Sequence, residues 1–252
     1  MKKTVVFSEL LNNQEQKAIA DIIANFDTKG KVFISGRNTI KLFEINNLKI
    51  NIKAFRVPNI VNQIAYKFFR KSKAQRSFEY ANKLINLGVG TPKPLAYFEF
   101  KTALFFKKSF YISEHLECNY TYRDLTKNFD IPDYENILRA FTRFTYNLHE
   151  KGIHFLDHSP GNTLIVKNEG NYNFYLVDLN RMNFGTLDFK TRIKNFSRLT
   201  IHKSMVEVMS DEYSKCSGED YNIIFNLMWK ETEDFQRRFY RKKRLKNKLK
   251  KA

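Results

Sequence analysis

Short runs of hydrophobic and β-branched residues, separated by polar turn residues, recur through the first part of the chain and are typical of β-strands. Two of the separators are Gly36-Arg37-Asn38 and Asn46-Asn47, and glycine and asparagine tolerate the positive φ angles of hairpin turns. Strands are therefore expected at residues 31–35, 39–45, 48–56, 95–100 and 104–115.

Helical periodicity interrupts this strand pattern. The apolar residues from Ala74 to Ile85 are spaced by four, three and four positions, which places them on one face of a helix. Ser72 is a typical N-cap for this helix, and Gly88 is a typical residue at its end. Further helices are expected at residues 14–25 and 60–70.

The second half of the chain changes character. A strongly amphipathic helix is predicted from Asp133 to Gly152, and a polar loop and a short hairpin follow it. From about residue 188 onwards the pattern is helical. Strands followed by helices predict an α+β fold of two lobes. The expected division is a β-rich N-lobe at 1–118, a mainly helical C-lobe at 119–236 and a basic C-terminal tail at 237–252.

The charge of the chain is strongly positive. Lysine and arginine number 44 against 26 acidic residues, which gives a net charge of +18. Ten of the basic residues lie between Arg237 and Lys251, where no acid occurs. A second acid-free cluster consists of Lys67, Arg70, Lys71, Lys73 and Arg76. Such clusters attract nucleic acid, anionic lipid or phosphorylated sugars, and they are also common as solvated surfaces.

Several classes of protein are excluded at this point. Hydrophobic residues make up 42% of the chain, which is too many for a mainly disordered protein. No apolar run approaches the roughly 18 residues that span a bilayer, and Ser8 and Glu9 interrupt the N-terminal apolar stretch too early for a secretory signal. Two cysteines cannot form a disulfide framework, so a cytoplasmic protein is expected.

The most informative segment is the polar loop after the long helix. Asp157 precedes Asn162 by five residues, and Asp178 follows the hairpin. In kinase-type phosphotransferases a loop carboxylate accepts the proton of the attacking hydroxyl, and an amide and a second carboxylate hold Mg²⁺. Asp157 is therefore the candidate catalytic residue, and Asn162 and Asp178 are the candidate metal ligands. Each alone is also a common turn residue.

A candidate phosphate-binding pair lies upstream. Lys53 interrupts an apolar strand, and a lysine in such a place needs a partner. Glu79 follows on a helix and is expected to pair with it, which would orient Lys53 on the phosphates of ATP. Gly36, Arg37 and Asn38 would then form the turn over the nucleotide, although a simple hairpin also explains the glycine and the asparagine.

Six short segments match motifs of one known family. They are 35–41 (SGRNTIK), 52–55 (IKAF), 70–79 (RKSKAQRSFE), 91–94 (TPKP), 157–162 (DHSPGN) and 177–182 (VDLNRM). On these segments the chain resembles the lipopolysaccharide core kinases of the 3-deoxy-D-manno-octulosonic acid (Kdo) type, from about residue 31 to residue 199. The resemblance implies a protein-kinase-like fold and ATP-dependent phosphorylation of a sugar hydroxyl, with Mg²⁺ or alternatively Mn²⁺ as the metal.

The resemblance also implies a lipopolysaccharide precursor as the acceptor and a peripheral place on the inner face of the cytoplasmic membrane, whose anionic surface would attract the basic clusters. Some positions depart from the pattern of protein kinases. Phe155 replaces a histidine two residues before the catalytic aspartate, and Leu179-Asn180 replaces Phe-Gly. No Ala-Pro-Glu-like stretch follows Asp178, which argues against a peptide acceptor and for a sugar.

Two other interpretations stay open at this stage. A kinase-like enzyme with a protein or another small molecule as acceptor keeps the chemistry and changes the substrate. A catalytically inactive kinase-like module would use its charge to bind anionic membrane or nucleic acid. The presence of Lys53, Asp157, Asn162 and Asp178 together favours the enzyme, and nucleic acid is the less favoured partner. The acceptor hydroxyl and the oligomeric state are left open.

Overall fold

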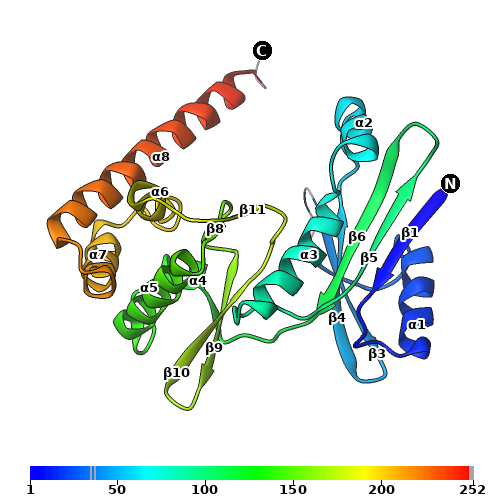
Figure 1. The fold of residues 1–252 in the computed structure, drawn as a ribbon, viewed down its shortest axis with the longest axis horizontal. Coiled ribbons are helices and arrows are strands. Elements are labelled where there is room, and N and C mark those ends of the chain that lie inside the picture. The colour runs from blue at the N-terminus through cyan, green and yellow to red at the C-terminus, as the bar shows by residue number, and fades with distance from the viewer. Residues whose placement is uncertain (35, 37, 250–252) are drawn as a thin grey trace. The chain divides into compact units, whose positions relative to one another are not determined.

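A computed structural model of the chain describes residues 1–34, 36 and 38–249 and divides it into two compact units. The first unit comprises Met1–Glu117 together with Asp178–Asn180, and the second comprises Cys118–Val177 and the chain from Arg181 onwards. Strands dominate the first unit and helices the second, which confirms the predicted fold class (Figure 1).

An antiparallel sheet of six strands forms the first unit, in the order β1-β5-β6-β4-β3-β2. Its strands are β1 (Lys2–Phe7), β2 (Lys31–Ile34), β3 (Thr39–Ile45), β4 (Leu48–Phe55), β5 (Pro94–Lys101) and β6 (Phe106–Glu114). The helices of this unit are α1 (Asn13–Ala24), α2 (Ile60–Phe68) and α3 (Lys73–Asn86), all within about two residues of the predicted bounds.

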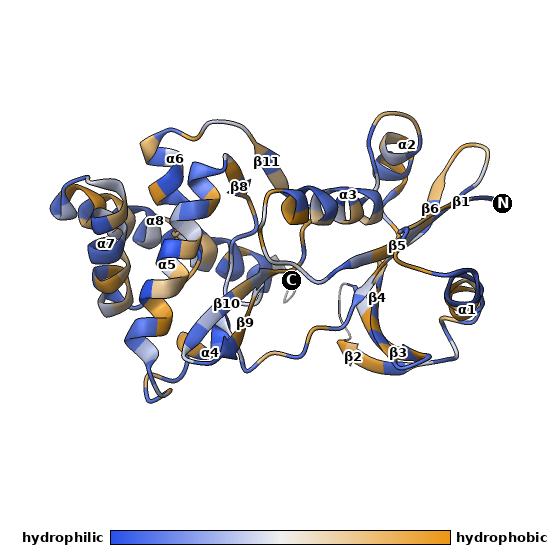
Figure 2. Cartoon of the chain, turned by 60° about the horizontal axis from the view of Figure 1, so that its bottom comes forward, coloured by the Kyte–Doolittle hydropathy of each residue, from blue (hydrophilic) through white to orange (hydrophobic). Residues whose placement is uncertain are grey.

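Helices cover both faces of this sheet (Figure 2). On one face, Ile19 of α1 belongs to the same buried cluster as Phe98 of β5. On the other face, Ala74 of α3 is buried together with Phe55 of β4. Because side chains alternate along a strand, Lys53, two residues before Phe55, lies on the α3 face of the sheet.

Two details test the sequence patterns directly. The hairpin between β3 and β4 turns through Asn46 and Asn47, whose φ angles are 47° and 68°, as their side-chain chemistry predicted. Strand β1 was not expected. It is an edge strand that pairs with β5 in the register Val5↔Phe98, and its mixed burial leaves no clear alternation in the sequence.

The second unit consists of helices around two small sheets, with the strand orders β10-β9-β7 and β11-β8. Its strands are β7 (Tyr120–Thr121), β8 (Ile153–Phe155), β9 (Thr163–Asn168), β10 (Asn171–Leu176) and β11 (Met182–Phe184). Its helices are α4 (Tyr122–Leu125), α5 (Tyr134–Glu150), α6 (Phe189–Lys194), α7 (Lys203–Ser217) and α8 (Tyr221–Leu249).

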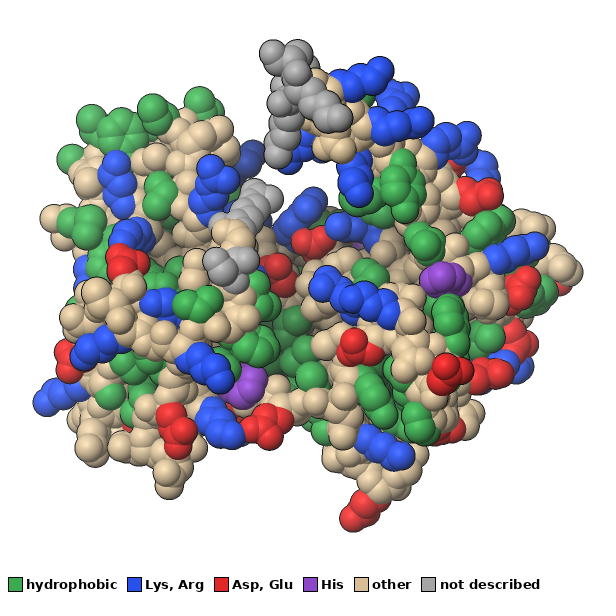
Figure 3. Space-filling model, turned by 180° about the vertical axis from the view of Figure 1, so that it is seen from behind, with side chains coloured by type: hydrophobic (Ala, Val, Ile, Leu, Met, Phe, Trp, Pro, Cys, Tyr) green, Lys and Arg blue, Asp and Glu red, His purple; other side chains and the backbone are tan. Residues whose placement is uncertain are grey.

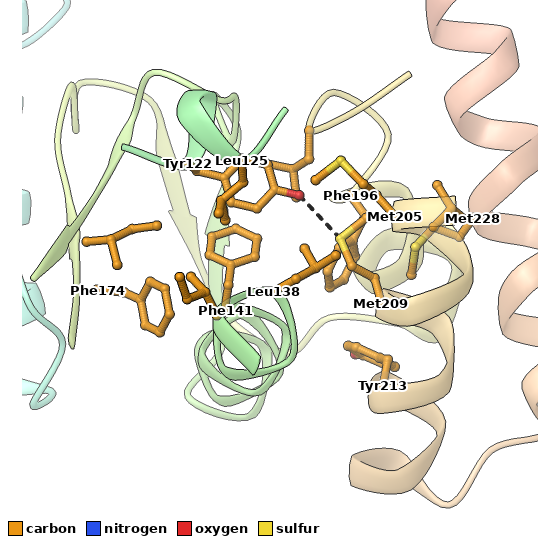
Figure 4. Packing of buried hydrophobic residues seen from close by; sticks show 14 of the residues in the cluster. Tyr122, Leu125, Leu138, Phe141, Phe174, Phe196, Met205, Met209, Tyr213 and Met228 are labelled. Atoms are coloured by element: carbon orange, nitrogen blue, oxygen red, sulfur yellow. Dashed lines mark hydrogen bonds between the residues drawn. The ribbon is translucent and has the colours of Figure 1, made fainter. Parts of the chain in front are cut away.

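Aromatic, aliphatic and methionine side chains together form the core of the second unit (Figure 4). Phe141 of α5 is fully buried, and its ring centroid lies 4.2 Å from that of Tyr122. The Tyr122 hydroxyl donates a hydrogen bond of 3.5 Å to the sulfur of Met209 on α7. Burying one such ring contributes about 1.5–3 kcal/mol to folding. This packing fixes α5, which leads directly into the polar loop.

The basic end of the chain belongs to a long helix. The described part of the predicted basic tail from residue 237 lies in the second half of α8, which runs without a break from Tyr221 to Leu249. Its first half is anchored by buried residues such as Ile224 and Met228, whereas every residue from Arg237 to Lys248 is exposed. Figure 3 shows lysine and arginine side chains along this part of α8. Within the described residues, no helix is long and apolar enough to cross a membrane.

Candidate active site

The polar loop is held between two pairs of backbone contacts. Gly152, at the end of α5, has a φ of 67°, and a Cβ there would lie 2.9 Å from the Gly185 carbonyl oxygen. The carbonyl of Gly152 accepts a hydrogen bond from the N–H of Gly185 at 2.9 Å. Strands β8 and β11 then pair, and the N–H of Leu156 donates to the Arg181 carbonyl at 3.1 Å. The loop therefore begins at a fixed point.

The structure brings Asp157 and Asn162 together. Asn162 donates from Nδ2 to the backbone carbonyl of Asp157 at 2.8 Å, which closes the loop. The N–H of Val177, at the end of the hairpin, donates to the Asn162 carbonyl at 3.0 Å. Because the amide nitrogen of Asn162 is used in this way, its Oδ1 is the atom left to bind a ligand.

Asp157 has a charged partner that the sequence patterns did not reveal. The guanidinium of Arg198 lies 2.8 Å from its Oδ1, and the same Nη1 donates to the Leu156 carbonyl at 3.2 Å. The guanidinium also lies over the ring of Phe235 on α8, 5.6 Å from its centroid. The Asp157 side chain is 22% exposed, so Arg198 fixes its carboxylate while leaving part of it accessible.

A second arginine lies against the loop. A Cβ at Gly161 would lie only 2.5 Å from Nη2 of Arg123, which is part of α4. A side chain at this position would displace the guanidinium from the loop backbone. Within the described residues, no carboxylate comes within ion-pair distance of Arg123, and the residue is exposed. Its charge is therefore available to an anion beside the polar loop.

Two buried histidines take part in the packing of the loop. His158 is enclosed by the rings of Phe141 and Phe155, at centroid distances of 5.4 and 5.7 Å, and burial lowers its pKa to about 3. Burial also lowers the pKa of His149 to about 4, and its ring nitrogens face Tyr213 and Asn195. Both imidazoles are neutral near pH 7, so they pack and orient rather than carry charge.

Asp178 adopts an unusual backbone conformation. Its φ is 60°, in the left-handed region that costs a residue other than glycine roughly 1–2 kcal/mol. Its Oδ1 lies 2.6 Å from Nζ of Lys53 and accepts a hydrogen bond of 2.6 Å from Asn180. Strain of this kind is concentrated at functional sites, where a side chain must point in one direction.

Lys53 and Glu79 do not form the predicted pair. Lys53, with a side chain only 13% exposed, binds Asp178 and lies 5.4 Å from the centroid of the Phe55 ring. The carboxylate of Glu79 instead binds Lys71 at 2.8 Å and accepts a hydrogen bond from Gln75 at 3.0 Å. Glu79 has a basic neighbour at the start of its own helix, and this shorter-range contact takes its carboxylate.

The candidate nucleotide turn is described only in part. Gly36 is exposed, and nothing lies within 4 Å of the position of a Cβ there. Asn38 accepts a hydrogen bond at its Oδ1 from the N–H of Arg56 at 3.3 Å, which ties the start of β3 to the end of β4. Arg37 lies outside the described residues. The backbone is thus accessible at Gly36, whereas the Asn38 side chain is already bound to the neighbouring strand.

The predicted magnesium ligands offer oxygen atoms, and they are few in number. Mg²⁺ prefers one or two protein oxygens together with phosphate oxygens and water. Asn162 offers Oδ1, and Asp178 offers a carboxylate that is already fixed by Lys53 and Asn180. Among the described residues, histidine, cysteine, aspartate and glutamate nowhere gather in threes around a possible metal position. Taken singly, each of the two residues therefore offers the kind of oxygen that Mg²⁺ binds.

The first unit is β-rich, and its strand lysine is bound to an aspartate. The second unit is mainly helical and has an Asp–Asn loop after its long helix. These features define a protein-kinase-like fold. A solved structure described as WaaP in complex with acyl carrier protein has this fold, with a TM-score of 0.61. The two chains are 15% identical, and the match covers 93% of this chain and 97% of that one.

The model of the lipopolysaccharide kinase (Kdo/WaaP) family matches residues 44–223. The chain therefore belongs to this family, as the sequence motifs indicated, and membership supports a phosphotransferase that acts on sugars of the lipopolysaccharide core. A search of curated protein sequences finds no significant match.

Arg198 and Arg123 are the site residues that sequence reasoning missed. Arg198 follows Asp157 by 41 positions in a helical stretch, where an arginine carries no signal of its own. The only signal for Arg123 is indirect and lies in Gly161, because a glycine inside the Asp–Asn loop indicates a close approach by another group.

Proposed function

We propose that the protein transfers the γ-phosphoryl group of ATP to a hydroxyl of Kdo in the inner core of a lipopolysaccharide precursor. The observation that carries this proposal is the contact of 2.6 Å between Lys53 and the strained Asp178. A lysine and an aspartate held together in this way are the two groups that kinase-like enzymes direct at the phosphates and their metal. Membership of the lipopolysaccharide kinase family supports a sugar as the acceptor.

The donor side of the reaction uses three residues that bind phosphate or metal, together with one turn, in this proposal. Lys53 binds phosphate oxygens, and Asn162 and Asp178 supply oxygens to Mg²⁺. When bound, the metal neutralises the charge of the triphosphate. The sequence segment Gly36-Arg37-Asn38 is expected to lie next to the phosphates. Glu79 is not needed to hold Lys53, because Asp178 already does so in the structure.

The acceptor side uses Asp157. Its carboxylate takes the proton from the attacking hydroxyl while the new O–P bond forms and the bond to the β,γ-bridging oxygen breaks, which releases ADP. Arg198 keeps the carboxylate in one orientation. Arg123 offers its guanidinium to an anionic group of the acceptor, and a sugar acid such as Kdo carries a carboxylate that suits it.

The test of the proposed function is a direct assay. The protein is incubated with ATP, Mg²⁺ and a lipid A precursor that bears Kdo, and the product is examined for the mass of one added phosphoryl group. Parallel samples contain an aminoglycoside or a protein mixture in place of the precursor. Phosphorylation of the Kdo sugar supports the proposal. Phosphorylation of another acceptor alone, or of none, refutes the assignment of the substrate.

Arg198 provides a prediction that separates positioning from binding. Arg198→Gln should lower kcat by about 10–100-fold, because the Asp157 carboxylate loses its fixed orientation, while KM for ATP stays unchanged. Arg198→Lys should restore part of the loss. The matched control is Arg192→Gln, which removes an ion pair with Glu150 and a hydrogen bond to the Leu187 carbonyl in the same unit. Equal losses in the two variants would reveal a general effect on stability.

We also propose that the protein is cytoplasmic and binds peripherally to the anionic inner face of the cytoplasmic membrane. The exposed part of α8 supports this, because each lysine or arginine near an anionic surface contributes about 1 kcal/mol of attraction. Among the described residues up to Lys248, truncation after Gln236 removes only exposed ones, and it leaves the anchored part of α8 in place.

The truncated protein should therefore bind anionic vesicles at least about tenfold more weakly at low salt, and the difference should shrink as salt is added. Co-sedimentation of both forms with vesicles measures this, and activity on a delipidated acceptor serves as the control for folding. If the two forms sediment alike at every salt concentration, the basic end of α8 is only a solvated surface.

A further inference from the structure

Helix α2 carries its apolar face towards solvent. Ile60, Val61, Ile64 and Phe68 fall within about 100° around the helix axis, and they are 65%, 75%, 41% and 57% exposed. Phe69, which caps the helix, is 83% exposed. A surface helix of a globular protein normally turns such a face to the core. We call these five residues the α2 face.

The opposite side of α2 explains why the helix keeps this orientation. Gln63 is buried and donates from Nε2 to the Pro58 carbonyl at 2.9 Å. Tyr66 packs against Phe106 of β6, with 5.8 Å between the ring centroids. Asn59 caps the helix by accepting from the N–H of Asn62 at 3.0 Å. The ring of Tyr66 thus packs α2 onto the sheet, whereas Gln63 and Asn59 bind the helix to the segment just before it. The residues of the α2 face are left outside these contacts.

Positive charge accompanies the α2 face. No acidic residue occurs between Val57 and Phe78, whereas Lys67 and Arg70 directly flank the exposed phenylalanines. The Lys67 ammonium lies 5.8 Å from the centroid of the Phe68 ring, and Arg70 is exposed. Exposed apolar residues beside basic ones suit the surface of an anionic membrane, at the boundary between acyl chains and headgroups. There the phenylalanine rings would enter the acyl region, and the lysine would reach back to the headgroup phosphates.

We propose that the α2 face inserts into the surface of an anionic lipid bilayer and so anchors the first unit there. This inference rests on the proposed function in one respect, because a lipid-borne acceptor brings the enzyme to a membrane. A bilayer is favoured over a protein groove by the breadth of the face, which spans neighbouring helix positions 60 and 61 as well as 64 and 68, and by its basic flank. The contribution differs from that of α8, since insertion of apolar groups persists when salt screens charge.

Vesicle binding tests this with matched variants. Ile64→Gln combined with Phe68→Gln should weaken binding to phosphatidylglycerol-rich vesicles by about 10–100-fold in 0.5 M salt, since two exposed side chains no longer enter the acyl region. Ile223→Gln, which changes an exposed isoleucine of α8, is the control and should bind like the unaltered protein. Activity on a delipidated Kdo acceptor should be the same in all three.

A fluorescent probe reports insertion itself. The chain has one tryptophan, Trp229, so a Trp229→Phe protein that also carries Phe68→Trp places a single indole on the α2 face. Vesicles with bromine atoms on the acyl chains should quench this indole strongly. The same background with Ile223→Trp should show little quenching, although the protein is bound.

Each outcome decides the proposal. The proposal is overturned if the indole at position 68 stays unquenched on vesicle-bound protein. It is also overturned if the α2 variant and the control bind vesicles equally. Equal binding is the result expected if an acidic protein covers the face instead. Binding needs neither ATP nor acceptor, so Asp157→Asn protein should bind vesicles normally. In the unaltered protein, vesicle binding through the α2 face without any kinase activity would therefore count against the proposed function alone. Kinase activity of the unaltered protein without insertion of the α2 face would count against the α2 face alone.

Discussion

Asp157→Asn is expected to lower turnover by about 10²–10⁴-fold, which is the usual share of general acid–base catalysis. The asparagine keeps the shape of the side chain and still accepts a hydrogen bond from Arg198, so the loop should keep its conformation. It cannot take the proton of the acceptor hydroxyl. Affinity for Mg²⁺-ATP should therefore remain, because the binding proposed above uses Lys53 and Asp178.

The experiment compares steady-state rates and calorimetric ATP binding for the variant and the unaltered protein. Asp130→Asn, a change of the same kind at an exposed residue of the same unit, is the control. Unfolding midpoints should agree among all three proteins. Turnover within a factor of a few of normal in Asp157→Asn would remove Asp157 from the role of proton acceptor.

The second large effect is expected at Asp178. Asp178→Ala should weaken Mg²⁺-dependent ATP binding by on the order of 100-fold or more, because the metal loses its carboxylate and the triphosphate loses its bridge to the protein. Calorimetry with and without Mg²⁺ measures this, and it needs no acceptor. Unchanged Mg²⁺-ATP affinity would place the metal site elsewhere.

The positive φ of Asp178 sharpens this test. Asp178→Gly removes the same carboxylate but accepts a φ of 60° without strain, so its free energy of unfolding should exceed that of Asp178→Ala by roughly 1 kcal/mol. Both variants should lose metal-dependent binding alike. If the glycine variant recovered ATP affinity, the loss in the alanine variant would be due to backbone distortion rather than to the missing ligand.

Local sequence signals predicted the elements that depend on near neighbours. The Asn46-Asn47 turn and the spacing from Ala74 to Ile85 fix a hairpin and a helix through contacts a few residues apart, and the structure has both. The position of Asp157 and Asn162 in one closed loop follows from the same kind of signal. Strand β1 was not predicted, because an edge strand needs no strict alternation of apolar and polar residues.

Partners across the sequence were harder to predict. Lys53 was correctly expected to need a carboxylate, but the sequence does not decide between Glu79 and Asp178, because both are far away along the chain. The choice depends on which oxygen the fold brings within ion-pair distance. Arg198 is a similar case, since only the folded chain brings it to Asp157. The orientation of α2 likewise depends on the packing of Tyr66 against Phe106, which the hydrophobic pattern of the helix does not reveal.

The contact between Gly161 and Arg123 has a consequence for how this chain can change over evolutionary time. A methyl group at position 161 would lie 2.5 Å from Nη2, at the far end of a flexible and exposed side chain, so the guanidinium would swing away at little cost. Substitution of Gly161 is therefore expected to leave the fold intact and to move the positive charge away from the loop. Selection at position 161 would then act on where this charge lies rather than on stability.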